Sequence, residues 1–132
     1  MKPRRITLAL MVASTALSVA GGAFAAEHRP FTVSGFAAAQ AAGKPIVVDV
    51  AASWCPICKA QAPIVDRLSS EPKFDHLVIF RLDYDAQPDQ WRKLGVRQQS
   101  TLIAFHGARE TARSVGDTQA SSIEQILEAT LR

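Results

Sequence analysis

The run PIVVDVA at residues 45–51 is apolar at every position except Asp49, so both of its alternating faces avoid water. A short run of this kind is typical of a strand buried on both sides of a sheet. HLVIFRLDY (76–84) and TLIAF (101–105) repeat the pattern. A weaker strand is expected at about 109–115, after a turn at residues 106–108. Strands buried on both faces require helices above and below the sheet.

Helix signals alternate with these strands. Ser34 can cap a helix that runs through Gln40 and is closed by Gly43. Apolar residues at helical spacing predict further helices in 55–70 and 118–132, and a shorter one in 87–95. This order predicts an α/β fold with a mixed central sheet of about four strands, flanked by helices on both faces. Its first two long strands are parallel through a right-handed crossover, and its last two form an antiparallel hairpin.

The first 25 residues are predicted to lie outside this domain. Three basic residues precede an apolar run, which ends in the small-residue pattern Ala23-Phe24-Ala25. This order is typical of a secretory signal peptide cut after about Ala25. A membrane anchor is the alternative, but the run is short for a span and contains serine and threonine. We then expect a lead-in at 26–33, with a short strand near its end, and one domain at 34–132.

Export would change both the charge and the redox setting of the chain. The full sequence carries 15 basic and 12 acidic residues, and three of the basic ones lie in the predicted leader. The mature formal charge is therefore zero, which gives no support for nucleic acid as a partner. An exported protein works in an oxidising compartment, here expected to be the periplasm, where disulfides persist. Two cysteines are few for a disulfide scaffold, so they are available for chemistry.

Both cysteines lie in the segment SWCPICK, where the first buried strand gives way to a helix. Cys55 falls at the helix start and Pro56 suits the first helical position. Free N–H groups and the positive end of the helix dipole stabilise a thiolate there, and the pKa of such a cysteine can fall to about 3.5–7.5. Cys58 lies one turn on, and deeper, where it can resolve a mixed disulfide. An inert disulfide and half of a metal site remain as alternatives.

A metal site of four ligands needs two more groups than this pair supplies. The three histidines, His28, His76 and His106, are scattered along the chain and are expected at the surface or in turns. We therefore assign no metal ligand, and the sequence carries no cofactor fingerprint.

An acid in a buried strand is costly when ionised, so Asp49 is expected to have a raised pKa and to hold a proton. It could take the proton of Cys58 during attack and return it later. Arg81 is the expected counter-charge, because the second long strand runs alongside the first. The alternatives are a solvent-facing or structurally paired acid and an exposed arginine.

Two more residues near the cysteines suggest roles in shaping the site. Pro63 removes one helix hydrogen bond, so a kink is expected that sets Cys55 beyond the sheet edge. Trp54 offers an apolar surface beside the sulfur for a docking partner, with core filling as the alternative.

These residues together resemble the thioredoxin family, specifically its exported bacterial members, over nearly all of 34–132. VVDVAASWCPICK looks like the family's strand, tryptophan and Cys-x-x-Cys-Lys segment, and Pro63 stands where the kink proline does. Arg81 stands where the family carries a lysine near the buried acid. LGVRQQSTLIAFHGARE resembles the loop, strand and turn opposite the active site, and SVG ending at Gly116 resembles the final strand. The resemblance implies a thioredoxin fold and substrate contacts at Trp54, Pro56, Ser100 and Thr101.

One position departs from the family pattern. The facing loop carries a cis-proline before a threonine in that family, whereas Ser100 precedes Thr101 here. A cis bond before a residue other than proline costs about 2.5–4 kcal/mol. We therefore predict a trans Gln99–Ser100 bond and a reshaped loop.

The sequence thus favours a monomeric periplasmic thiol–disulfide oxidoreductase that reduces protein disulfides. The resemblance implies a membrane electron carrier that delivers electrons from cytosolic thioredoxin. A metallochaperone for copper or iron, an oxidant of exported proteins, and a structural protein with a permanent disulfide remain as alternatives.

Overall fold

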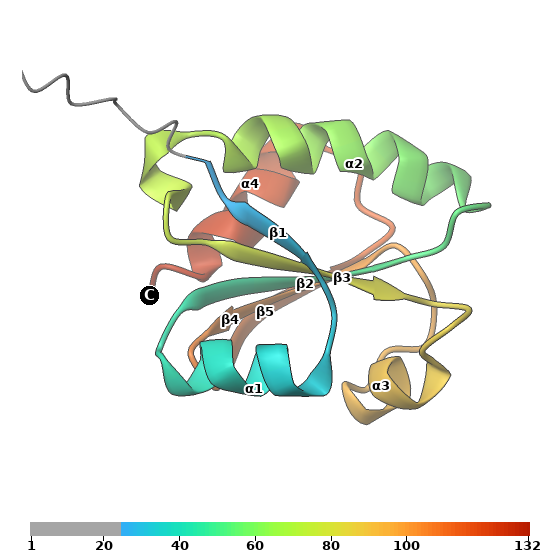
Figure 1. Cartoon of the computed structure of the whole chain (residues 1–132). Helices are drawn as coiled ribbons and strands as arrows, with labels where there is room; N and C mark the ends of the chain where they lie inside the picture. The colour runs from blue at the N-terminus through green and yellow to red at the C-terminus, as the bar shows by residue number, and fades with distance from the viewer. Residues whose placement is uncertain (1–24) are drawn as a thin grey trace, which may run out of the picture.

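The computed structural model describes residues 25–132, and the signal-peptide prediction lies almost wholly outside them. Five strands form one sheet in the order β1-β3-β2-β4-β5 (Figure 1). They are β1 (Glu27–Pro30), β2 (Pro45–Ala51), β3 (Val78–Asp83), β4 (Thr101–His106) and β5 (Arg109–Val115). The helices are α1 (Val33–Ala41), α2 (Pro56–Ser69), α3 (Pro88–Lys93) and α4 (Ala120–Ala129), with a 3-10 turn at Pro72–Phe74.

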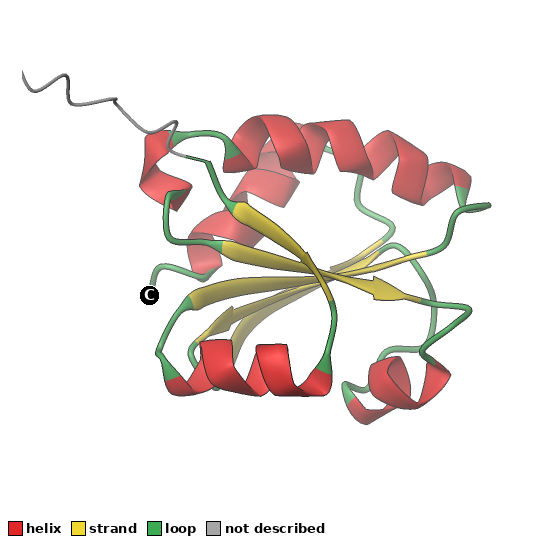
Figure 2. Cartoon of the chain, viewed as in Figure 1, coloured by secondary structure: helices red, strands yellow, loops and turns green. Residues whose placement is uncertain are grey.

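Helices cover both faces of this sheet, as the apolar strands require. α2 and α4 lie on one face, and α1 and α3 lie on the other (Figures 1 and 2). Alternate residues of β2 divide between the two cores: Val47 packs with the α2 and α4 side, whereas Ile46, Val48 and Val50 pack on the opposite side. The predicted α/β class and mixed sheet are confirmed.

The strand directions are also confirmed. β2 and β3 are parallel, β4 lies antiparallel to β2, and β4 with β5 forms the antiparallel hairpin. In the parallel pair, Asp49 lies directly opposite Arg81. Both side chains belong to the α2 face, because Val47 and Ile79, two residues earlier in each strand, pack in the core on that side.

The sheet has five strands where about four were expected, because β1 adds a strand at its edge. It pairs in parallel with β3, and Ala26 just before it is buried and donates its backbone N–H to the carbonyl oxygen of Ser69 at 3.0 Å. Residues 26–30 thus belong to the folded domain, and the strand lies earlier than expected. Pro30 is tolerated because this is an edge strand.

The start of α1 also differs from the expected one. Thr32, not Ser34, is the N-cap, and its hydroxyl accepts a hydrogen bond from the Gly35 N–H at 3.0 Å. Ser34 lies inside the first turn and is exposed. The helix ends at Ala41, and Gly43 follows with φ 67°, a left-handed conformation that suits glycine.

The last helix is shorter than its apolar pattern suggests. The helix expected in 118–132 ends at Ala129, and Leu131 beyond it is 44% exposed. Within residues 25–132, no helix combines the length and the hydropathy needed to cross a membrane.

Candidate active site

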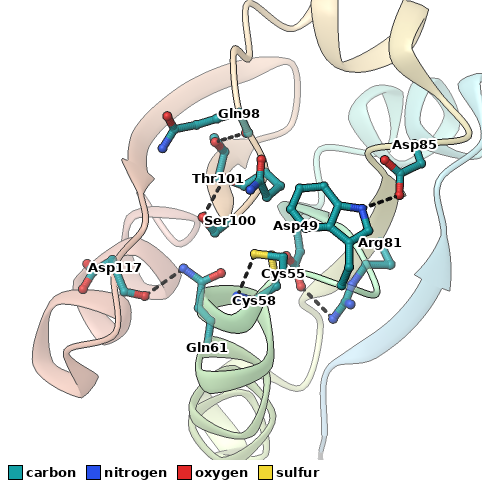
Figure 3. The surroundings of a disulfide bond; sticks show 12 residues. Asp49, Cys55, Cys58, Gln61, Arg81, Asp85, Gln98, Ser100, Thr101 and Asp117 are labelled. Carbon is teal, nitrogen blue, oxygen red and sulfur yellow. Dashed lines mark hydrogen bonds and ion pairs between the residues drawn. A yellow bond between two sulfur atoms is a disulfide. The ribbon is translucent and has the colours of Figure 1, made fainter.

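Cys55 and Cys58 form a disulfide at the start of α2. Cys55 is the N-cap residue, and its sulfur accepts a hydrogen bond from the Cys58 N–H at 3.1 Å (Figure 3). Pro56 occupies the first helical turn, where a missing N–H costs nothing. The sulfur of Cys55 therefore lies at the positive end of the helix dipole, next to donors that the helix cannot satisfy itself.

The expectation that Cys58 lies deeper than Cys55 is wrong for the oxidised protein. Cys55 is 1% exposed and Cys58 is 6% exposed, so both are buried. The side chain of the N-cap cysteine turns back over the first helical turn, and both cysteines pack with Ala51 and Ala52. Tyr84, from the segment after β3, packs against this cluster.

Asp49 is a buried acid with an ion-pair partner, as the strand pattern predicted. Its carboxylate lies 2.9 Å from the Arg81 guanidinium, and the aspartate is 4% exposed. Burial raises the pKa of the Asp49 carboxyl above its ordinary value, although the positive charge of Arg81 acts in the opposite direction. Asp49 and Arg81 belong to the surroundings of the disulfide (Figure 3), so the site combines a redox pair with an acid whose pKa is raised by burial.

Trp54 lies on the surface at the mouth of the site. It is 55% exposed, and its indole N–H donates a hydrogen bond to Asp85 at 2.8 Å. Pro56 is also exposed, and Ile57 is 44% exposed. The apolar surface expected at Trp54 is present, and the alternative of core filling is wrong.

Pro63 lies inside α2, which continues as a helix on both sides of it. The residue is exposed, so its ring takes up none of the core volume. The kink and its effect on Cys55 stay predictions.

The Gln99–Ser100 bond is trans, as predicted, and the facing loop has an unusual backbone. Ser100 has φ 57°, the single positive φ of a residue other than glycine in the described chain. Its carbonyl accepts a hydrogen bond from Gly116 at 2.9 Å, and its hydroxyl donates to the carbonyl of Gln99. These contacts hold Ser100 in a left-handed conformation that costs about 1–3 kcal/mol for a residue with a side chain.

Ser100 and Thr101 are both buried, at 2% and 1% exposed. The hydroxyl of Thr101 donates to the carbonyl of Gln98 at 2.8 Å. Both side chains therefore brace their own loop, and any contact with a substrate would use the backbone. Their part in substrate binding stays a prediction.

Sequence reasoning missed two contacts that support the site. The carboxylate of Asp85, 31 positions further along the chain, accepts a hydrogen bond from the indole N–H of Trp54. The side-chain amide of Gln61 donates a hydrogen bond at 2.8 Å to the backbone carbonyl of Asp117, which lies 56 positions away. Gln61 is 2% exposed, so this bond ties α2 to the segment after β5. The one available signal was a glutamine on the apolar side of the predicted helix, which indicates a buried hydrogen bond.

The histidines do not gather at the cysteines. His106 bonds the carbonyl of Thr130 at 2.8 Å, while His28 and His76 are exposed beside aspartates. In the part of the chain that the structure describes, no group of three or more metal-ligating side chains is close enough to hold an ion.

Comparison with known proteins agrees with this geometry. The thioredoxin family model matches residues 29–129, so the chain belongs to the thioredoxin family. The fold, the family and the disulfide at the start of α2 together define a thiol–disulfide oxidoreductase of the thioredoxin type.

Individual relatives show how far the similarity extends. Thioredoxin-1 of Saccharomyces cerevisiae is 36% identical over 99 residues, covering 74% of this chain and 92% of that protein. The bifunctional thioredoxin reductase/thioredoxin of Mycobacterium leprae is 36% identical over 81 residues, which cover 61% of this chain but 18% of that protein. The crystal structure of Trxlp from Edwardsiella tarda EIB202 has a TM-score of 0.75 at 37% identity, covering 76% of this chain and 98% of that one.

Proposed function

We propose that this protein is exported to the periplasm and there reduces disulfides of other proteins. The observation that carries the proposal is the buried Asp49 in the surroundings of the redox pair, because a proton acceptor is needed each time a dithiol reduces a partner. Exposed Trp54 and Ile57 at the mouth supply an apolar surface on which a protein partner can dock.

The reaction begins with the reduced protein. The Cys55 thiolate attacks a sulfur of the substrate disulfide, forms a mixed disulfide and releases one substrate thiolate, which takes a proton from water. Asp49 then accepts the proton of Cys58, whose sulfur attacks Cys55 and breaks the mixed disulfide, and Asp49 returns the proton to the second substrate thiolate as it leaves. Two electrons pass to the substrate together with the proton of Cys58, and the protein is left with the Cys55–Cys58 disulfide that the structure shows.

The reduced form must be regenerated after each turnover. The predicted leader supports a site of action outside the cytoplasm, where a membrane electron carrier would supply thioredoxin-derived electrons. The protein is proposed to act as a monomer in both exchanges.

A trapping experiment tests this function. Cys58→Ser should accumulate mixed disulfides between Cys55 and periplasmic proteins, identified by mass spectrometry after export of the full chain. Cys55→Ser is the matched control and should trap nothing. If the two variants give the same adducts, or if the protein stays in the cytoplasm with its leader attached, the proposal is wrong.

The direction of electron flow is tested by redox equilibrium with glutathione. A reductant is expected to have a potential near that of thioredoxin, about −270 mV, whereas a strong oxidant lies near −120 mV. A value close to the latter would reassign the protein as an oxidant of exported proteins. Ultraviolet titration of the reduced protein should show one thiolate forming well below the ordinary thiol range near pH 8.5, because of the helix start.

A further inference from the structure

A cavity of about 240 Å³ opens beside the loop that faces the disulfide. It is lined by residues 95–98, Thr101, Arg113 and Val115. Thr101 pairs with Val115 and Ile103 with Arg113, and Ile103 packs in the core under α1 and α3. The cavity therefore lies on the sheet face opposite α2, at the same end of the sheet as the cysteines.

The loop from Gly95 to Ser100 contributes residues 95–98 to the lining of the cavity, and Ser100 lies between Thr101 and the disulfide in Figure 3. Gln98 and Thr101 lie on one side of the sulfur atoms in Figure 3, and Asp85 lies on the other side. A partner segment that crosses the sheet end over Ser100 can therefore contact the disulfide and the cavity together. The carbonyl of Ser100 is already bonded to Gly116, so this part of the wall is held in place.

The lining of the cavity combines apolar and cationic groups. Val96 is buried, and Val115 is 51% exposed, so an apolar side chain in the cavity would remove Val115 from water. Arg113 is anchored, because it donates to the carbonyl of Leu94 at 2.7 Å and pairs with Glu110 at 2.8 Å. Arg97 is exposed and forms no ion pair within residues 25–132, so it leaves an uncompensated positive charge at the rim.

The opposite side of the mouth carries the opposite charge. Asp85 is exposed, and it holds the indole of Trp54 without an ion-pair partner among the described residues. Asp83 next to it is also exposed and caps the backbone N–H groups of Asp85 and Ala86. The mouth is therefore negative on the Trp54 side and positive on the Arg97 side.

We propose that this cavity is a specificity subsite, which receives an apolar side chain of the substrate protein that has an acidic neighbour. The inference rests on the proposed reduction of protein disulfides. The apolar side chain fills the cavity against Val96 and Val115, and the acidic neighbour lies at Arg97. Charge complementarity of this kind selects among partners and speeds their encounter.

Three cyclic disulfide peptides of equal length test the subsite. One carries Leu-Asp beside its attacked cysteine, the second carries Leu-Lys and the third carries Gly-Asp. The reduced mature protein is mixed with each peptide, and the second-order rate constant is measured by acid quench and mass spectrometry. The Leu-Asp peptide should react roughly two- to fivefold faster than the Leu-Lys peptide, and this ratio should shrink at high salt. The Leu-Asp peptide should also react faster than the Gly-Asp peptide, because glycine has no side chain to fill the cavity.

Charge reversal at one residue then decides the assignment. Arg97→Glu should invert the preference between Leu-Asp and Leu-Lys, and Arg97→Gln should abolish it. Arg67→Glu makes the same charge change at an exposed position in the last turn of α2 and should leave the preference intact. Bis(2-hydroxyethyl) disulfide is neutral, and it is too short to extend from Cys55 into the cavity. The rate constant for its reduction should therefore be equal in all four proteins.

The outcomes separate the subsite from the function. Equal rates for the three peptides, or a preference that survives Arg97→Glu, would overturn the subsite and leave the reductase intact. If the wild type reduces none of the peptides, the reductase proposal is itself wrong and the subsite is overturned with it.

Discussion

At the residue scale, the ion pair of Asp49 and Arg81 joins a buried group to an exposed one. Asp49 is almost fully enclosed, whereas the Arg81 side chain is 53% exposed at the sheet surface. The guanidinium cannot give up its proton, so the pair changes charge through Asp49 alone. Water around Arg81 screens its positive charge. Burial therefore raises the pKa of Asp49 by more than the charge of Arg81 lowers it.

Asp49→Asn should slow disulfide exchange near neutral pH by up to about 100-fold, the low end for a positioned general base, with the fold retained. Asparagine has a similar shape but cannot accept the proton of Cys58. The wild-type rate should fall as the pH drops through the raised pKa of Asp49, and the variant should lack this inflection. Stopped-flow reduction of a protein disulfide from pH 5 to pH 9 measures both, and identical profiles would remove Asp49 from the mechanism.

The same substitution should change stability in a pH-dependent way. The folded pKa of Asp49 lies above the unfolded value of about 3.9, so its contribution is fully present below that value and is lost as the pH rises through the folded pKa. Asp49→Asn should therefore match the wild type near pH 3.5 and be the more stable protein near pH 7.5. Urea unfolding at the two pH values measures the difference, and a variant less stable at pH 7.5 would contradict the prediction.

At the scale of elements, the apolar pattern predicted the strands inside the sheet but not β1, the strand at one of its two edges. β2, β3 and β4 were readable because buried strands need nearly continuous apolar runs. The pairing of Asp49 with Arg81 followed from two such strands lying side by side in parallel. β1 has the sequence EHRP, which shows neither alternation nor strand propensity, and its hydrogen bonds with β3 come from the backbone alone.

Local signals were also insufficient where two residues compete or where partners lie far apart. Thr32 and Ser34 can both cap a helix, and the choice depends on where the chain leaves β1. The bonds from Trp54 to Asp85 and from Gln61 to Asp117 depend on how α2 packs, which no sequence spacing records. The burial of Cys55 depends on the side-chain geometry of one helical turn.

Thr32→Ala should lower the free energy of unfolding by about 1 kcal/mol, because the Gly35 N–H loses its acceptor. Ser34→Ala is the matched control. It removes a hydroxyl that caps nothing, so the expected change is within about 0.5 kcal/mol. Guanidinium unfolding of both variants measures the difference. A larger loss of unfolding free energy in Ser34→Ala than in Thr32→Ala would show that Ser34 is the N-cap.

At the scale of the whole molecule, the described fold includes Ala26, the residue directly after the predicted leader. Ala26 packs in the core under α2 and α4, and β1 covers the outer edge of β3. The expected cut after Ala25 would therefore leave almost no unfolded chain before the first strand. Residues 26–30 complete the sheet and are more than a lead-in.

Removal of residues 26–30 should lower the free energy of unfolding by roughly 2–4 kcal/mol. The loss combines a few backbone hydrogen bonds at about 0.5–1.5 kcal/mol each with exposure of the β3 edge. A chain that lacks the exposed residues 131–132 is the control and should unfold almost as the full mature chain does. Equal urea midpoints for the two shortened chains would show that β1 adds no stability.

The burial of Ala26 has a practical consequence for anyone who labels or purifies this protein. Its backbone N–H reaches the carbonyl oxygen of Ser69, at the end of α2 opposite the cysteines. An affinity tag joined directly to this residue would begin at a buried position that is hydrogen-bonded to the helix that presents the reactive sulfur. Leu131 and Arg132 are exposed, so a tag or fluorophore attached there would lie away from this hydrogen bond.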